Sequence, residues 1–161
     1  MLARLSATLI YVVIFGTTSS AAATAPRSAA MSCPTARQMG AAMGIHVQNS
    51  VPGNQKSKLT GYGGCGYIIQ PLVGIGVIAS TTSTLTQFRT LERLTANHAK
   101  TRLLAGVAQG AFLETIGTSR EVTAIDVPDL VSVSTGSSRI STRQLERAAV
   151  FVLSRLQRPP T

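Results

Sequence analysis

Residues 66–81 have the sequence GYIIQPLVGIGVIAST, and this stretch decides the fold class because it predicts an antiparallel β-hairpin. Residues 66–70 and 75–81 are apolar and rich in β-branched side chains, which favour strands. Between them, Pro71 to Gly74 supply the turn that brings the two strands together. The domain is therefore expected to contain a sheet in which consecutive strands pair.

Further strands are predicted downstream of this hairpin. Residues 122–127 alternate weakly between apolar and polar side chains, Pro128-Asp129 turns the chain, and residues 130–134 follow as the partner strand. Residues 111–116, which lie between two glycines, favour one more strand. With the hairpin, these segments predict a sheet of four to five strands.

Three helices are predicted because three hydroxyl-bearing residues are each followed, three positions later, by glutamine. This is the spacing of a capping box, in which both side chains bind free backbone N–H groups at the start of a helix. The helices are expected over residues 36–43, 85–104 and 143–157, and the third has apolar residues at three- and four-residue spacing. The three capping boxes are Thr35/Gln38, Thr84/Gln87 and Ser141/Gln144.

The order of these elements is helix, hairpin, helix, hairpin and helix, which suggests a duplicated helix–strand–strand plan. An antiparallel sheet with helices segregated to one side is the usual result of such an order. We therefore predict an α+β fold, with an antiparallel sheet of four to five strands and three helices packed mainly on one face.

The first residues predict export from the cytosol. Arg4 precedes an apolar run over residues 9–15, and small residues follow over 17–25, with Ala21-Ala22-Ala23 as a cleavage site. The apolar run is shorter than the roughly 20 residues that cross a bilayer, which argues against a permanent anchor. We expect a signal peptide at 1–23, a disordered mature N-terminus at 24–32, and one α+β domain at 33–158.

Cys33 and Cys65 are the two cysteines of the chain. In an oxidising compartment, an even number of cysteines predicts a disulfide. This bond would close a loop of about 33 residues and stabilise the domain by roughly 3–4 kcal/mol. The alternative is lipidation of Cys33 at the mature N-terminus, although the preceding Ala30-Met31-Ser32 fits a lipidation signal poorly.

The chain is basic, with 15 Lys and Arg against 6 Asp and Glu and a formal net charge of +9. Excess positive charge favours encounters with anionic partners. Because export separates the protein from nucleic acid, the expected partners are anionic lipid, a wall polymer or another protein. The predicted location is secreted or within the cell envelope.

Motifs for catalysis or for cofactor binding do not stand out. His46 and His98 have no neighbouring ligands at metal-site spacing, and no serine lies in a G-x-S-x-G turn. The glycines of residues 61–66 precede a β-branched run, whereas a phosphate-binding loop precedes a helix. We therefore assign no catalytic residue, no metal ligand and no cofactor from the sequence.

Four segments of the chain form a pattern: Ser32-Cys33-Pro34 before a short helix that ends at Gly44, Gly64-Cys65-Gly66-Tyr67, residues 106–112, and the terminal amphipathic helix. This pattern resembles that of the small exported or lipid-anchored cell-envelope proteins of mycobacteria and related actinobacteria, many of which are domains of unknown function. The resemblance implies an α+β domain with a structural disulfide, and it carries no catalytic residues.

These features favour a secreted, non-enzymatic binding domain of the envelope or extracellular space. An apolar ligand would fit a groove between helices and sheet, lined by Met39, Met43, Phe88 and Leu91. One alternative is a small secreted hydrolase that uses a histidine with a serine distant in sequence. Another is a secreted inhibitor or effector that acts through an exposed loop at residues 51–62.

Overall fold

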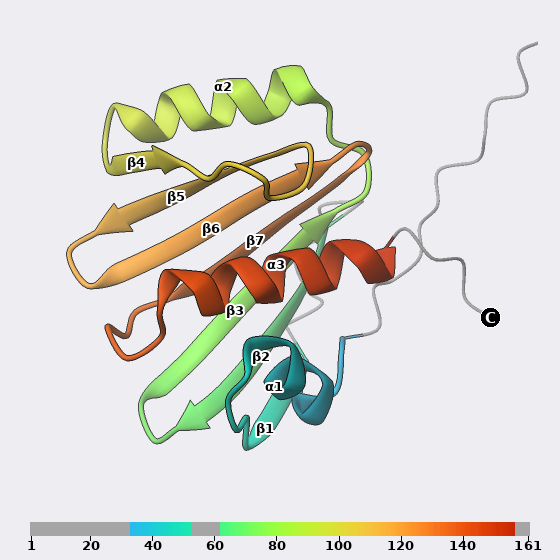
Figure 1. Cartoon of the computed structure of the whole chain (residues 1–161), viewed down its shortest axis with the longest axis vertical. Helices are drawn as coiled ribbons and strands as arrows, with labels where there is room; N and C mark the ends of the chain where they lie inside the picture. The colour runs from blue at the N-terminus through green and yellow to red at the C-terminus, as the bar shows by residue number, and fades with distance from the viewer. Residues whose placement is uncertain (1–32, 53–61, 157–161) are drawn as a thin grey trace, which may run out of the picture.

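The computed structural model describes residues 33–52 and 62–156, and it confirms the α+β class (Figure 1). One antiparallel sheet of seven strands has the order β1-β2-β3-β7-β6-β5-β4. The predicted signal peptide, the predicted mature N-terminus and most of the loop at 51–62 lie outside the described residues. The helices are α1 (Ala36–Met43), α2 (Leu85–Ala96) and α3 (Thr142–Leu156), and the strands are β1 (Asn49–Pro52), β2 (Tyr62–Gln70), β3 (Val73–Ser80), β4 (Lys100–Leu103), β5 (Gly110–Ile116), β6 (Ser119–Asp126) and β7 (Asp129–Thr135).

The prediction of four to five strands was too low, because it missed the two edge strands, β1 and β4. Each is four residues long, and neither shows the alternation of a half-buried strand. β1 contains Asn49 and Pro52, which are rare in strand interiors, and β4 has the sequence KTRL. Such short, polar or charged strands are typical of sheet edges. The segment predicted as the end of the second helix is therefore β4, and α2 ends at Ala96.

The sheet consists of two meanders that meet at one strand pair. The first meander is β1–β3 and the second is β4–β7, and β3 pairs with β7 in the register Val77↔Val133. A helix precedes each meander, but the plan is not a simple repeat because the meanders have three and four strands. Sequential pairing within each meander explains why the local hairpin signals were sufficient to identify the inner strands.

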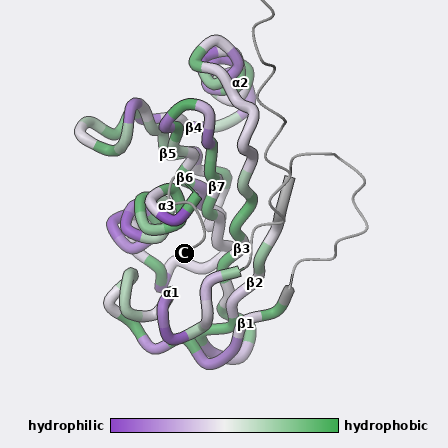
Figure 2. The backbone as a smooth tube through the Cα atoms, turned by 90° about the vertical axis from the view of Figure 1, so that its right-hand side faces the viewer, coloured by the Kyte–Doolittle hydropathy of each residue, from purple (hydrophilic) through white to green (hydrophobic). Residues whose placement is uncertain are grey.

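The helices lie on both sides of the sheet. α1 and α3 cover one side, which we call the α3 face, and Figure 2 shows them together in a nearly edge-on view. α2 packs on the other side, the α2 face, where its Phe88 joins a cluster with Phe112 and Ile125. Phe112 and Ile125 are each next to a residue of the larger core cluster, Leu113 and Ala124. Because adjacent strand residues point to opposite faces, the two clusters lie on opposite sides of the sheet.

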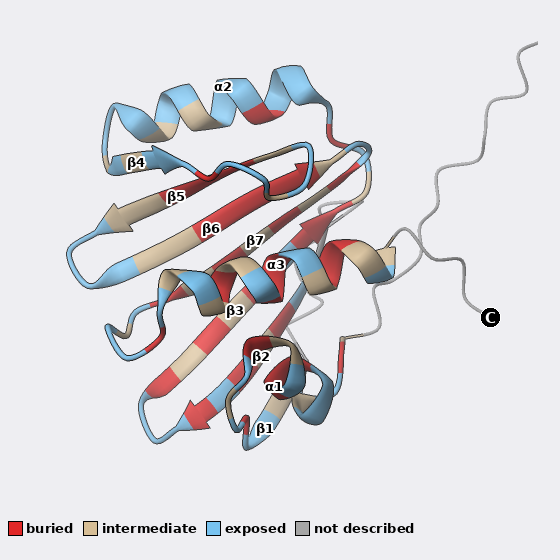
Figure 3. Ribbon diagram, viewed as in Figure 1, coloured by how far each residue is buried: buried red, intermediate tan, exposed pale blue. Residues whose placement is uncertain are grey.

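Burial differs strongly between the helices on the two faces, because α2 is mostly exposed whereas buried residues recur along α3 (Figure 3). The large core lies between the sheet and the pair α1 and α3, and α3 alone contributes five buried residues. α2 contributes one buried residue, Phe88. The helices of the described segments include none that is long and apolar enough to cross a membrane.

All three predicted capping boxes are present. In the first, Gln38 N donates to Thr35 Oγ1 at 3.2 Å, and Thr35 N donates to the Gln38 side chain at 3.0 Å. The boxes of α2 and α3 repeat this reciprocal pattern. α1 ends at Gly44, whose φ of 71° is the left-handed conformation that glycine adopts without strain.

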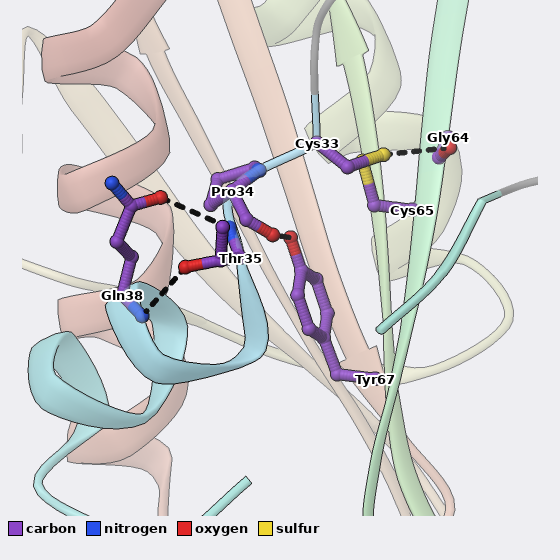
Figure 4. The surroundings of a disulfide bond; sticks show 7 residues. All are labelled: Cys33, Pro34, Thr35, Gln38, Gly64, Cys65 and Tyr67. Atoms are coloured by element: carbon purple, nitrogen blue, oxygen red, sulfur yellow. Dashed lines mark hydrogen bonds between the residues drawn. A yellow bond between two sulfur atoms is a disulfide. The ribbon is translucent and has the colours of Figure 1, made fainter. Parts of the chain in front are cut away.

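The predicted disulfide is present and ties the segment before α1 to β2 (Figure 4). The Cα atoms of Cys33 and Cys65 are 5.7 Å apart, and Cys33 Sγ also contacts the carbonyl oxygen of Gly64 at 3.6 Å. Beside it, the buried Tyr67 hydroxyl donates to the carbonyl oxygen of Pro34 at 2.9 Å. Burial raises the pKa of Tyr67 to about 12, and the nearby positive charge of Arg155 opposes this rise. The hydroxyl therefore remains protonated and donates this hydrogen bond. The disulfide and the hydrogen bond together attach the segment before α1 to β2.

Candidate functional site

The four residues predicted to line an apolar groove do not come together. Met39 and Met43 are fully buried in the large core, on the α3 face. Phe88 belongs to the small cluster on the α2 face, and Leu91 on the same helix is 40% exposed. The sheet thus lies between the two pairs, and three of the four residues are core residues.

The two histidines lie near opposite edges of the sheet. His46 is in the connection between α1 and the edge strand β1, and His98 is between α2 and the edge strand β4. Both are exposed. Within residues 33–52 and 62–156, no group of three or more His, Cys, Asp or Glu could hold a metal ion.

A cavity of about 390 Å³ opens on the α3 face, where three connections meet. They are the α1–β1 connection, the β2–β3 turn and the loop from β7 into α3. We call this cavity the arginine pocket. Its lining residues are Ile45, His46, Gln48, Ile69, Gln70, Val73, Arg139, Ile140 and Gln144.

The floor and the rim of the arginine pocket differ in chemistry. Ile69, Val73 and Ile140 are buried and give an apolar floor. The rim carries His46, Arg139 and three glutamine side chains. A concave apolar site with a few polar groups at its mouth is the usual form of a small-molecule site. The charged group of this rim is cationic, so the pocket favours a ligand with an acceptor-rich or anionic end.

Hydrogen bonds hold Arg139 at the rim. Arg139 Nη1 donates to Gln70 Oε1 at 3.0 Å, and its backbone N–H donates to Ser137 Oγ at 3.2 Å. The loop itself is fixed from β6, because Arg120 Nη2 donates to the carbonyl oxygens of Ser137, Ser138 and Ile140. One arginine thus orders the loop that presents another.

Exposed arginines also lie along α3, which begins next to this pocket. Arg143 and Arg147 are one helical turn apart on α3, and Arg155 lies further along the same helix. A Cβ built on Gly44 would lie 3.4 Å from Arg147 Nη1, so this guanidinium lies over the end of α1, two residues before His46. Neither Arg143 nor Arg147 lines the arginine pocket itself, so the cationic surface of α3 lies beside the cavity and not inside it.

A second cavity, of about 310 Å³, lies on the α2 face. Gly74 and Gly76 of β3 leave its floor without side chains, and Ser134 of β7 lies beside them. Glu114 and Glu121 line its other side. We call this cavity the glutamate groove.

The two glutamates are directly opposite each other on β5 and β6. Burial, followed by the charge of Glu121, raises the pKa of the Glu114 carboxyl. Thr123 Oγ1 donates to Glu121 Oε1 at 3.4 Å and lies 2.8 Å from Ser132 Oγ. Arg120 also lines this groove, but its guanidinium binds the carbonyl oxygens of the loop after β7. The groove is therefore suited to a proton or a cation, in contrast to the arginine pocket.

Sequence reasoning missed both cavities. The strand predicted from residue 122 begins at Ser119, so Glu121 lies outside the predicted strands; with the observed two-residue turn at Gly117-Thr118, Glu114 lies opposite Glu121. The arginine pocket had no comparable local signal, since its residues come from three connections far apart in the chain.

Similarity to known proteins does not assign a ligand to either cavity. No family model, no curated protein and no solved structure matches the chain. The class of ligand is therefore assigned from the chemistry of this protein's own residues.

Proposed function

We propose that the protein is an exported, non-enzymatic binding domain that attaches to anionic lipid surfaces of the cell envelope through its α3 face. The observation that carries this proposal is the gathering of exposed arginines on one side of the molecule. They are Arg37 on α1, Arg139 in the loop before α3, and Arg143, Arg147 and Arg155 on α3.

The charged residues of the sheet are divided between the two faces in the same way. Lys100 and Arg102 occupy strand positions on the α3 face, whereas the facing pair Glu114 and Glu121 lies on the α2 face. An anionic surface therefore attracts one side of the domain and is repelled by the glutamate groove on the other side. Near an anionic bilayer, each basic residue contributes about 1 kcal/mol.

The proposed location outside the cytosol rests on features other than the arginines. The predicted signal peptide and the resemblance to exported envelope proteins favour an extracytoplasmic destination, and the disulfide is compatible with it. Such a compartment brings the α3 face close to anionic lipid headgroups.

A vesicle-retention experiment with two matched double variants tests the proposal. Arg143→Gln/Arg147→Gln removes a one-turn pair from α3, and Arg89→Gln/Arg93→Gln removes an identically spaced pair from α2. Both variants lose the same charge, so net charge alone would weaken them equally. We expect the α3 variant to lose most of its retention on phosphatidylglycerol vesicles and the α2 variant to keep most of it.

Salt and lipid composition provide the controls. Retention of the unmodified protein should fall steeply between about 50 and 200 mM salt, and vesicles of phosphatidylcholine alone should retain little. Equal loss in the two double variants, salt-independent retention, or no retention on anionic vesicles would overturn the proposal.

A further inference from the structure

We propose that the arginine pocket binds a single-chain anionic amphiphile, with its acidic head at Arg139 and its apolar chain over the floor. This inference rests on the proposed function in that both place an anionic partner on the α3 face. It goes further because it assigns a discrete, saturable site and a ligand class to one cavity.

The rim provides the contacts for the acidic head. Arginine has five N–H donors, and the hydrogen bond from Arg139 Nη1 to Gln70 occupies one nitrogen. An exposed guanidinium held in this way can bind a carboxylate or phosphate through two parallel hydrogen bonds. His46 and Gln48, which line the same cavity from the α1–β1 connection, add further polar groups.

The floor provides the contacts for the apolar chain. Ile69, Val73 and Ile140 are 8%, 9% and 3% exposed, and they come from β2, β3 and the loop before α3. A simple inorganic anion would leave this floor in contact with water. An amphiphile covers it, and each additional buried methylene should tighten binding by about fourfold until the cavity of about 390 Å³ is full.

The glutamate groove makes the assignment specific to one cavity. It is of similar size, but its side chains include Glu114 and Glu121, which repel an acidic head. The only charged lining residue it has in addition, within the part of the chain that the structure describes, is Arg120, which is bound to backbone carbonyls. An anionic amphiphile should therefore occupy the arginine pocket alone.

Calorimetric titration of the purified protein with decanoate, below its micelle concentration, tests the inference. We expect saturable binding of one decanoate per chain, weaker binding of octanoate, and at least tenfold weaker binding of inorganic phosphate. Arg139→Gln should weaken decanoate binding at least tenfold and leave the binding of the neutral analogue decanol within twofold. Arg89→Gln on α2, which removes the same charge, should bind decanoate like the unmodified protein.

Failure of this inference can be distinguished from failure of the surface proposal. If decanoate does not saturate, if phosphate binds equally well, or if Arg139→Gln and Arg89→Gln behave alike, the pocket assignment is wrong. Anionic vesicles can retain the protein in each of those cases. Conversely, Arg143→Gln/Arg147→Gln should lose vesicle retention and still bind decanoate, and circular dichroism should show every variant folded.

Discussion

Val77 and Ile78 are neighbours on β3, yet Val77 is 1% exposed on the α3 face and Ile78 is 54% exposed on the α2 face. The same contrast extends across the sheet. On the α3 face, α1 and α3 close over a large core, whereas on the α2 face the buried cluster consists of Phe88, Phe112 and Ile125. The strands are shared, so the difference in burial arises from the helices that cover each face.

Charge follows the same division. The strand positions on the α3 face include Lys100 and Arg102, and those on the α2 face include Glu114 and Glu121. Alternation along a strand sends adjacent side chains to opposite sides, so one strand can present different charges on its two faces. The α3 face thus combines most of the burial with the larger group of exposed arginines, while the other side carries Arg89 and Arg93 on α2 and an acidic groove on the sheet.

The largest expected effect comes from removing the disulfide that fixes α1 to the α3 face. Cys33→Ser/Cys65→Ser releases a link between residues 32 positions apart and should lower the free energy of unfolding by about 3–4 kcal/mol. Urea unfolding followed by circular dichroism measures this change. Tyr67→Phe, which keeps the disulfide and removes the hydrogen bond to Pro34, should cost only about 1 kcal/mol. Equal stability of the double variant and the unmodified protein would contradict the structural role of the bond.

The contrast in burial predicts a difference between two adjacent truncations. Val77→Ala removes buried methyl groups on the α3 face and should cost about 2 kcal/mol. Ile78→Ala removes a larger group from the more exposed position and should cost less than about 1 kcal/mol. The same urea experiment measures both. If Ile78→Ala were the more destabilising change, the α2 face would be covered in solution by more than α2.

Much of this architecture was predictable because its signals are local. Thr35/Gln38 and the other two capping boxes identify the start of each helix within a four-residue window, and the apolar runs of β2, β3 and β7 identify inner strands. The Cys33–Cys65 bond followed from the number of cysteines. The edge strands could not be found in this way, since KTRL gains its strand conformation from pairing with β5.

The candidate site was less predictable than the fold. The arginine pocket requires Gln70 and Arg139, which are 69 positions apart, to form a hydrogen bond across two turns. No periodicity within a single segment contains this information. Met39 and Phe88 were both predicted to face one groove, but the sheet lies between them because α1 and α2 pack on opposite sides.

A smaller effect is expected at the helix caps, where the two faces should again differ. Thr84→Ala and Ser141→Ala each remove the hydroxyl of a capping box and should each cost about 1 kcal/mol. α2 has one buried residue and α3 has five. Thr84→Ala should therefore destabilise α2 alone, whereas Ser141→Ala should destabilise the whole domain. Hydrogen exchange should show faster exchange within α2 alone for Thr84→Ala, and across the sheet for Ser141→Ala. Global destabilisation of equal size in both variants would mean that α2 is as firmly coupled as α3.

The smallest effect concerns the glutamate groove and depends on pH. Burial and the charge of Glu121 raise the pKa of Glu114 above its ordinary value of 4.5, so the folded protein holds this proton more tightly than the unfolded chain does. The free energy of unfolding therefore falls as pH rises from 4.5 through the raised pKa, and the penalty persists at higher pH. Glu114→Gln abolishes this fall. It should gain on the order of 0.5 kcal/mol at about pH 7 and nothing at about pH 3.

Substitution of Glu121 distinguishes the two causes of the raised pKa of Glu114. Glu121→Gln removes the facing charge and leaves the burial of Glu114, so it should recover part of the gain seen for Glu114→Gln. The double variant should gain less than the two single variants combined, because either substitution alone already removes the repulsion. Strict additivity would show that the two carboxylates do not interact across β5 and β6, and that the acidity of the α2 face consists of independent groups.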